Sequence, residues 1–230
     1  MKTIGLIGGM SWESSVEYYR VINEEVKNRL GGLHSAKCIM YSVDFEEIER
    51  CQSEGDWAKA GETLGDAAHA LEMSGAEFIV ICTNTMHKVV EAVEQKIEIP
   101  ILHIADATAK QIRKAEMKTV GLLGTKYTME QDFYKSRIAA SDIQVLVPNQ
   151  EDREVINGII FQELCLGKIE PSSRDVFRRI IKGLIAQGAE GIILGCTEIG
   201  LLVKPEDSEV PLFDTAVIHA LEAVEAAFES

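Results

Sequence analysis

Two short segments carry the side chains of this sequence that are best suited to chemistry. They are CTE at 196–198 and TNT at 83–85, and each directly follows a short apolar run. Both lie in an internal repeat that aligns Thr83 with Cys196, GAEFIVICTNTMH at 75–87 and GAEGIILGCTEIG at 188–200. Two groups facing each other suit a reaction that removes a proton from one face of a carbon and delivers another to the opposite face. A thiolate suits the role of base, since backbone N–H groups and the positive end of a helix dipole lower its pKa.

The repeat extends over the whole chain and predicts the elements that position these segments. The other matching segments are MKTIGLIGG at 1–9 with MKTVGLLGT at 117–125, and IPILHIADATA at 99–109 with VPLFDTAVIHA at 210–220. Apolar, β-branched runs predict buried parallel strands at 2–7, 78–81, 118–123 and 191–194. Helical patterns occupy 11–29, 57–73, 130–139 and 172–187, with Ser14 and Glu17 spaced as a capping box. This alternation predicts an α/β fold of two pseudo-symmetric domains, each a parallel sheet flanked by helices.

The same repeat predicts the domain boundaries. The strand and helix predicted at 210–228 match 99–116, where the chain passes from one half to the other. In a swapped arrangement, the C-terminal helix packs back on the first half. We therefore expect a first domain of 1–97 plus 209–230 and a second domain of 98–208.

Ligands of parallel sheets bind beyond the carboxyl ends of the strands, which predicts an active site in the cleft between the two domains. The catalytic candidates are Cys196 and Thr83. The candidates for substrate binding carry hydroxyl, amide or backbone N–H groups near these strand ends: Met10, Gln52, Asn84, Thr85, Thr125 and Thr197. Glu198 is a supporting candidate that orients Cys196 or binds an ammonium group. Cys82 is expected to face away from the site, because alternate residues of a strand point in opposite directions.

The composition of the chain argues against several classes of binding partner. The 37 acidic residues exceed the 23 basic ones, and the net charge of −14 repels phosphate backbones and anionic lipid. We therefore expect neither a nucleic-acid nor a membrane partner. Five cysteines without a C-x-x-C motif, and His87 and His103 without ligand spacing, predict no disulfides and no metal. The sequence shows no signal peptide and no apolar run of about 20 residues, which predicts a cytoplasmic protein.

Five motifs together make the chain resemble the aspartate/glutamate racemases over essentially its whole length. They are GGMSW at 8–12, TNTMH at 83–87, HIADAT at 103–108, LLGT at 122–125 and GCTEIGLLV at 195–203. The chain is similar in particular to bacterial members described as L-aspartate/glutamate-specific or broad-specificity amino-acid racemases. The resemblance implies a homodimer that acts on amino acids without pyridoxal phosphate, metal or another cofactor. It also implies a cysteine on each face of the substrate.

This sequence departs from the family pattern at one position. The family has Cys-Asn-Thr in the first motif, whereas this chain has Thr83 at the position of that cysteine. The resemblance implies that the second cysteine, Cys196, acts on the L-enantiomer. We therefore expect a cofactor-independent racemase of L-glutamate, L-aspartate or a broader set of L-amino acids, in which Cys196 removes the Cα proton and Thr83 returns one slowly. Two alternatives stay open: a single-cysteine decarboxylase or isomerase of the same superfamily, and a catalytically impaired amino-acid-binding protein.

Overall fold

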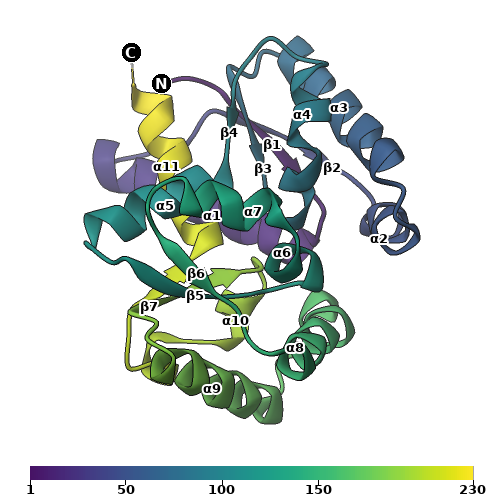
Figure 1. Ribbon diagram of the computed structural model, residues 1–230. Coiled ribbons are helices and arrows are strands. Elements are labelled where there is room, and N and C mark those ends of the chain that lie inside the picture. The colour runs from purple at the N-terminus through teal and green to yellow at the C-terminus, as the bar shows by residue number, and fades with distance from the viewer. Residues whose placement is uncertain (230) are drawn as a thin grey trace. The chain divides into compact units, whose positions relative to one another are not determined.

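The computed structural model describes residues 1–229, and its contacts divide the chain into two compact units (Figure 1). Met1–Ile104 and the residues from His219 onward form the first unit, and Ala105–Ile218 form the second. Each unit contains a four-stranded parallel sheet flanked by helices. The predicted α/β architecture is therefore confirmed.

The sheet of the first unit has the strand order β2-β1-β3-β4. Its strands are β1 (Ile4–Gly8), β2 (Cys38–Ser42), β3 (Phe78–Ile81) and β4 (Ile101–Leu102). The helices between them are α1 (Trp12–Leu30), α2 (Phe45–Glu54), α3 (Trp57–Met73), the 3-10 turn η1 (Thr85–Val89) and α4 (Val90–Glu94). Every residue of β1 and β3 is buried, which agrees with the apolar runs that predict them.

The sheet of the second unit has the equivalent order β6-β5-β7-β8. Its strands are β5 (Thr119–Gly124), β6 (Gln144–Leu146), β7 (Gly191–Gly195) and β8 (Leu212–Asp214). Its helices are α6 (Lys126–Glu130), α7 (Asp132–Ala139), α8 (Gln150–Gln162), α9 (Pro171–Ala186) and α10 (Ile199–Leu202), with 3-10 turns η2 (Leu164–Leu166) and η3 (Pro205–Asp207). The matching strand orders are the structural counterpart of the sequence repeat.

Two of the helix predictions differ from the structure in detail. Helix α1 begins at Trp12, and the side chain of its N-cap Ser11 accepts a hydrogen bond from the backbone N–H of Ser14. The capping box that would begin at Ser14 is therefore wrong, because the helix has already started there. The single helix predicted at 130–139 is two helices, α6 and α7, which meet at the extended residue Gln131.

The halves of the chain exchange a helix but not a strand. Strand β4 pairs with β3, and β8 pairs with β7, so each strand stays in the sheet of its own half. The helices that follow, α5 (Ile104–Lys114) and α11 (Thr215–Phe228), cross into the other unit after their first residues. The contacts divide the chain after Ile104 and after Ile218, whereas the sequence repeat places the boundaries after residue 97 and before residue 209.

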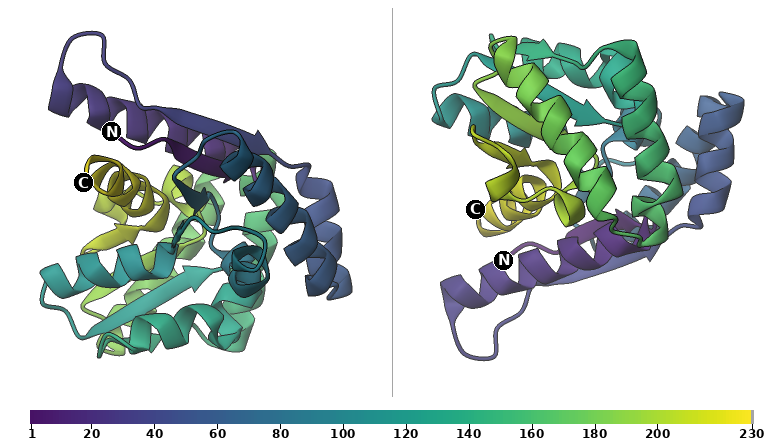
Figure 2. Two further views of the ribbon diagram at one scale, coloured as in Figure 1. Left: turned by 90° about the horizontal axis from the view of Figure 1, so that it is seen from above. Right: turned by 90° about the horizontal axis from the view of Figure 1, so that it is seen from below.

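Hydrogen bonds and ion pairs fix both exchanged helices. The backbone N–H of Lys2 donates to the carbonyl of Ala227 in α11 at 2.8 Å, and Arg29 pairs with Glu225. Figure 2 shows the beginning of the chain beside the end of α11. In the second unit, Arg137 of α7 pairs with Asp106 of α5 at 2.7 Å. Each unit is therefore completed by a helix from the other half of the sequence.

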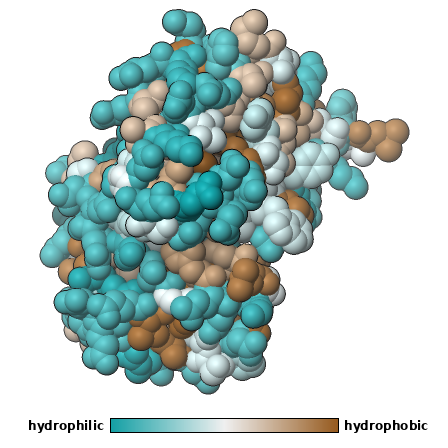
Figure 3. All heavy atoms as spheres, turned by 90° about the vertical axis from the view of Figure 1, so that its right-hand side faces the viewer, coloured by the Kyte–Doolittle hydropathy of each residue, from teal (hydrophilic) through white to brown (hydrophobic). Residues whose placement is uncertain are grey.

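The face of the molecule that Figure 3 shows is mainly hydrophilic, with separate apolar areas. The large apolar side chains that stay exposed include Trp12, Val16, Tyr19 and Leu33. Among residues 1–229, no helix combines the length and the hydropathy that crossing a membrane requires.

Candidate active site

The strand order of each unit marks one place for a ligand. In the first unit the chain passes from β1 to β2 on one side and then to β3 on the other, and the second unit repeats this with β5, β6 and β7. Open parallel sheets bind ligands outside the carboxyl ends of the strands at such a switch point. The switch points are the ends of β1 and β3 and the ends of β5 and β7. The predicted catalytic residues directly follow β3 and β7.

The first unit brings its predicted site residues together. Met10 follows β1, and Thr83 follows β3; both are buried. Gln52 comes from α2, and its side-chain amide donates to the sulfur of Met86 at 3.2 Å, directly beyond the TNT segment. The remaining predicted residues of this unit, Asn84 and Thr85, are buried in the turn that leads into η1.

Hydrogen bonds of the Ser15 side chain fix the loop after β1. The hydroxyl of Ser15 accepts from the backbone N–H of Gly9 and donates to the carbonyl of Ser11, both at 2.8 Å. Gly9 has a φ of 95°, and a Cβ there would collide with the backbone of Val43. Glycine is therefore required at this position, and the loop presents the Met10 backbone in a fixed place.

The second unit packs its two site loops closely. Gly124 and Gly195 are register partners on β5 and β7, and a Cβ on Gly124 would lie 2.8 Å from the carbonyl oxygen of Gly195. This close approach places Thr125 beside the start of the CTE segment. Thr125 caps α6, since its side chain accepts from the backbone N–H of Thr128.

Glu198 is the centre of the polar contacts around Cys196. The thiol of Cys196 donates to Glu198 Oε2 at 2.9 Å, and the hydroxyl of Thr197 donates to the same oxygen at 2.9 Å. All three side chains are buried, with Cys196 8% exposed and Glu198 2% exposed. The carboxylate is thus placed to accept the proton of the thiol.

The electrostatics of Cys196 differ from the sequence-based expectation. Burial raises the pKa of the Cys196 thiol well above its ordinary value, and the charge of Glu198 raises it further. The backbone N–H of Glu198 lowers the pKa of this thiol, as expected for such a donor, but burial and the charge of the carboxylate outweigh it. The resting group is therefore a thiol, and a thiolate forms when the proton has moved to an acceptor.

Cys82 is enclosed in the core of the first unit. It has no exposed surface, and its sulfur points to the carbonyl of Val80 at 3.8 Å. Burial raises the pKa of its thiol strongly. These observations agree with the expectation that it faces away from the site.

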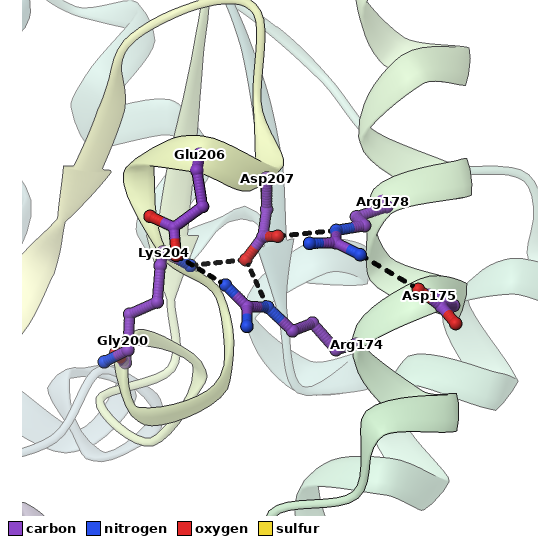
Figure 4. Close-up of polar contacts among 7 residues, drawn as sticks. All are labelled: Arg174, Asp175, Arg178, Gly200, Lys204, Glu206 and Asp207. Carbon is purple, nitrogen blue, oxygen red and sulfur yellow. Dashed lines mark hydrogen bonds and ion pairs between the residues drawn. The ribbon is translucent and has the colours of Figure 1, made fainter.

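An ion-pair cluster anchors the segment that follows α10 (Figure 4). The buried carboxylate of Asp207 accepts from Nε of Arg174 at 2.7 Å, from Nε of Arg178 at 2.5 Å and from the backbone N–H of Lys204 at 2.7 Å. Both arginines belong to α9, so the cluster ties η3 to that helix. This cluster was not predicted, although Arg174 and Arg178 have the i, i+4 spacing of one helix face.

His87 and His103 are buried in the first unit, as structural histidines are expected to be. The Nδ1 atom of His87 hydrogen-bonds the carbonyl of Thr83 at 2.8 Å, and the two imidazole centroids lie 4.4 Å apart. The contact of His87 with Thr83 was not predicted, although the two residues are four positions apart, the spacing of neighbours across one helical turn. Among residues 1–229, no group of three or more His, Cys, Asp or Glu side chains is arranged to hold a metal ion.

The protein is an internally duplicated α/β protein. Each of its two units has a parallel sheet with an equivalent strand order, and a thiol and hydroxyls lie at the switch points. The chain belongs to the Asp/Glu/Hydantoin racemase family, whose model matches residues 7–223. Its fold is similar to that of a Yersinia pestis protein provisionally described as an Asp/Glu racemase, at 57% identity over 100% of both chains with a TM-score of 0.92.

Two further relatives are described as a racemase or as a homologue of one. An aspartate racemase homologue from Pyrococcus horikoshii is 39% identical over 100% of both chains, with a TM-score of 0.85. A broad specificity amino-acid racemase from Bacillus subtilis is 27% identical over 162 residues, which cover 69% of this chain and 68% of the relative. Racemases are isomerases, and this is the class of enzyme to which the family assigns the chain.

Proposed function

We propose that this chain racemises L-glutamate, L-aspartate or a broader set of L-amino acids without a cofactor. The observation that carries the proposal is the buried Cys196 thiol, which donates to the Glu198 carboxylate at the end of β7. Membership of the racemase family and the broad specificity named for the Bacillus subtilis relative support the reaction and its substrate class.

Proton transfer begins at Cys196. The thiol gives its proton to Glu198, and the resulting thiolate takes the Cα proton of the L-substrate. The high pKa of Cys196 makes this thiolate a strong base once it forms. The hydroxyl of Thr197, 2.9 Å from Glu198 Oε2, stabilises the carboxylate in the resting state.

Thr83 serves the opposite face of Cα in this proposal. Its hydroxyl delivers a proton to the carbanion, and a water reprotonates Thr83. The proton that Glu198 took from Cys196 then returns to the hydroxide left by that water, which restores the thiol, the carboxylate and the hydroxyl of the resting state. A hydroxyl is a much weaker base than a thiolate, so Thr83 abstracts a proton from a D-enantiomer slowly. Because the two enantiomers have equal free energies, slow transfer at Thr83 limits racemisation in both directions, whereas Cys196 exchanges the α-proton of an L-substrate faster than inversion occurs. Rapid turnover of D-aspartate or D-glutamate by the native chain would contradict this assignment.

Substrate carboxylates are bound by uncharged donors in this proposal, because a protein with a net charge of −14 does not attract anions through its overall charge. The proposed donors are the side chains or backbone of Met10, Gln52, Asn84, Thr85, Thr125 and Thr197. Such donors also stabilise the negative charge that develops as the Cα proton leaves.

We further propose that the enzyme acts as a homodimer in the cytoplasm.

Proton exchange at Cα tests the proposal directly. L-glutamate and L-aspartate are incubated in D₂O with the enzyme, followed by proton NMR of the α-proton and by chiral chromatography of the same samples. We expect loss of the α-proton signal and slow appearance of D-product. Cys196→Ala is expected to abolish both. Cys82→Ala, which removes a thiol enclosed in the core, is the matched control and keeps both.

Two outcomes would contradict the proposal. Exchange that survives in Cys196→Ala would mean that another group is the base. Absence of exchange with a panel of L-amino acids would refute racemisation, and would favour the single-cysteine decarboxylase or isomerase, or the binding protein.

A further inference from the structure

Three buried histidines lie together in the first unit, and the proposed proton transfers use none of them. His87, His103 and His219 are 1%, 4% and 0% exposed. The ring centroid of His87 lies 4.4 Å from that of His103 and 5.8 Å from that of His219. His87 is hydrogen-bonded to the turn that carries Thr83.

The hydrogen bonds of His87 fix its tautomer. Its Nδ1 lies 2.8 Å from the carbonyl oxygen of Thr83, and because a carbonyl only accepts, Nδ1 carries the hydrogen. Its Nε2 accepts from the backbone N–H of Ile104 at 3.3 Å, so Nε2 carries none. The ring is therefore uncharged, and both of its nitrogens are occupied by backbone partners. Because its single N–H is bonded to the Thr83 carbonyl, His87 stabilises the turn and does not deliver a proton to a substrate.

The two bonds tie the site turn to a second element. The backbone N–H of Thr83 donates to the carbonyl of Ile81 at 2.8 Å, and the Thr83 carbonyl accepts from His87. The Thr83 backbone is thus held on both sides. Through His87 it is joined to Ile104, the first residue of α5. A movement of the Thr83 peptide would break a buried hydrogen bond, which is costly.

We infer that His87 is a positioning residue for Thr83 and thereby controls inversion rather than proton abstraction. The inference rests on the proposed function, in which Thr83 and Cys196 serve opposite faces of Cα. His87 acts on the face that Thr83 serves. Its effect falls on the delivery of the second proton, while deuterium exchange initiated by Cys196 continues.

A pair of substitutions separates the two hydrogen bonds of the ring. In His87→Asn the amide nitrogen takes the place of Nδ1, so the bond to the Thr83 carbonyl is kept and the bond from Ile104 is lost. In His87→Gln the amide oxygen takes the place of Nε2, so the Ile104 bond is kept and the Thr83 bond is lost. Each variant loses one buried bond, so both are destabilised to a similar degree.

The measured quantity is the ratio of D-product formed to α-proton exchanged, from L-glutamate in D₂O. We expect this ratio to fall about fivefold in His87→Gln, as the loss of one hydrogen bond predicts, and to stay close to wild type in His87→Asn. His219→Gln is the control: His219 bonds Leu102 and Tyr18, so its variant loses stability but keeps the ratio.

Three outcomes would overturn the inference. Equal ratios in His87→Asn and His87→Gln, or a fall of the same size in His219→Gln, would show that the histidines only stabilise the unit. A wild-type enzyme that exchanges without inverting would leave no inversion for His87 to control. If the wild type exchanges nothing, the proposed function itself fails, which is a distinct result from an unchanged ratio.

Discussion

Removal of the Tyr18 hydroxyl tests how much the buried histidines contribute to the first unit. The hydroxyl of Tyr18 lies 2.9 Å from Nδ1 of His219, whose Nε2 donates to the carbonyl of Leu102 at 2.8 Å. Because Nε2 carries the hydrogen, Nδ1 accepts from the hydroxyl. Both side chains have no exposed surface. Tyr18→Phe therefore leaves a buried acceptor without this donor, while the edge-to-face ring contact at 5.7 Å is kept.

The expected cost is about 2 kcal/mol, the price of one unsatisfied buried acceptor without a cavity. For a chain of this size it corresponds to a fall in Tm of about 4–8 °C. Tyr19→Phe is the matched control. Tyr19 is 53% exposed on the same helix, so loss of its hydroxyl is expected to change the Tm by less than about 2 °C.

Guanidinium denaturation followed by tryptophan fluorescence is the assay. Trp12 and Trp57 are the two tryptophans of the sequence, and both lie in the first unit, so fluorescence reports on the unit that the substitution affects. We expect the fluorescence midpoint to fall in Tyr18→Phe and to stay unchanged in Tyr19→Phe. Equal midpoints for Tyr18→Phe and wild type would refute the reasoning, since they would mean that the acceptor is satisfied without Tyr18.

Four further predictions follow from other contacts. Burial lowers the pKa of His219 to about 4, below its ordinary 6.5, so the unfolded chain alone takes up a proton between these values. Stability is therefore lost as the pH falls through this window, by roughly 3 kcal/mol, and His219→Gln should lose this dependence in denaturation curves. Thr83→Cys supplies a thiol on the second face and should raise turnover of D-glutamate on the order of 100-fold, whereas Thr83→Ser should not; equal rates would contradict the role of Thr83. Gly124→Ala should destabilise the protein by about 1–3 kcal/mol, since its Cβ would lie 2.8 Å from the Gly195 carbonyl; an unchanged Tm would argue against the close strand approach. Asp207→Asn should lower the Tm more than Asp175→Asn, because the Asp207 side chain is fully buried and that of Asp175 is 71% exposed; the reverse order would remove the anchoring role of the cluster.

The central strands could be predicted from the sequence because they are buried on both faces. Strands β1, β3, β5 and β7 appear as apolar runs, and the site residues follow from where those runs end. The edge strands β2 and β6 were missed. Their residues are exposed or half-buried, so no apolar run marks them. Apolar runs therefore revealed the fully buried strands, whereas the partly buried β4 and β8 were revealed by the repeat.

Contacts that depend on side-chain direction could not be predicted. The residue types at 196–198 suggested a base, but the bond from Cys196 to Glu198, and the rise in the thiol pKa that burial and this carboxylate cause, depend on how the turn folds. The bond between His87 and Thr83 depends in the same way on a 3-10 turn. The sequence indicated which groups lie at the strand ends, and the structure shows which of them bond to one another.

The exchange of α5 and α11 bears on how such a chain can arise. In a polypeptide made of one half alone, the last helix would not pack on the sheet of its own chain. Two identical chains would therefore have to exchange this helix, as in a domain-swapped dimer, for each to be complete. In the present chain the residues between Lys114 and Thr119 join the exchanged helix of one half to the first strand of the next. Fusing two copies of a gene requires no more than a connection of this length. Contacts first made between two ancestral molecules would then persist inside one, with the two copies free to diverge, as Thr83 and Cys196 have at equivalent positions.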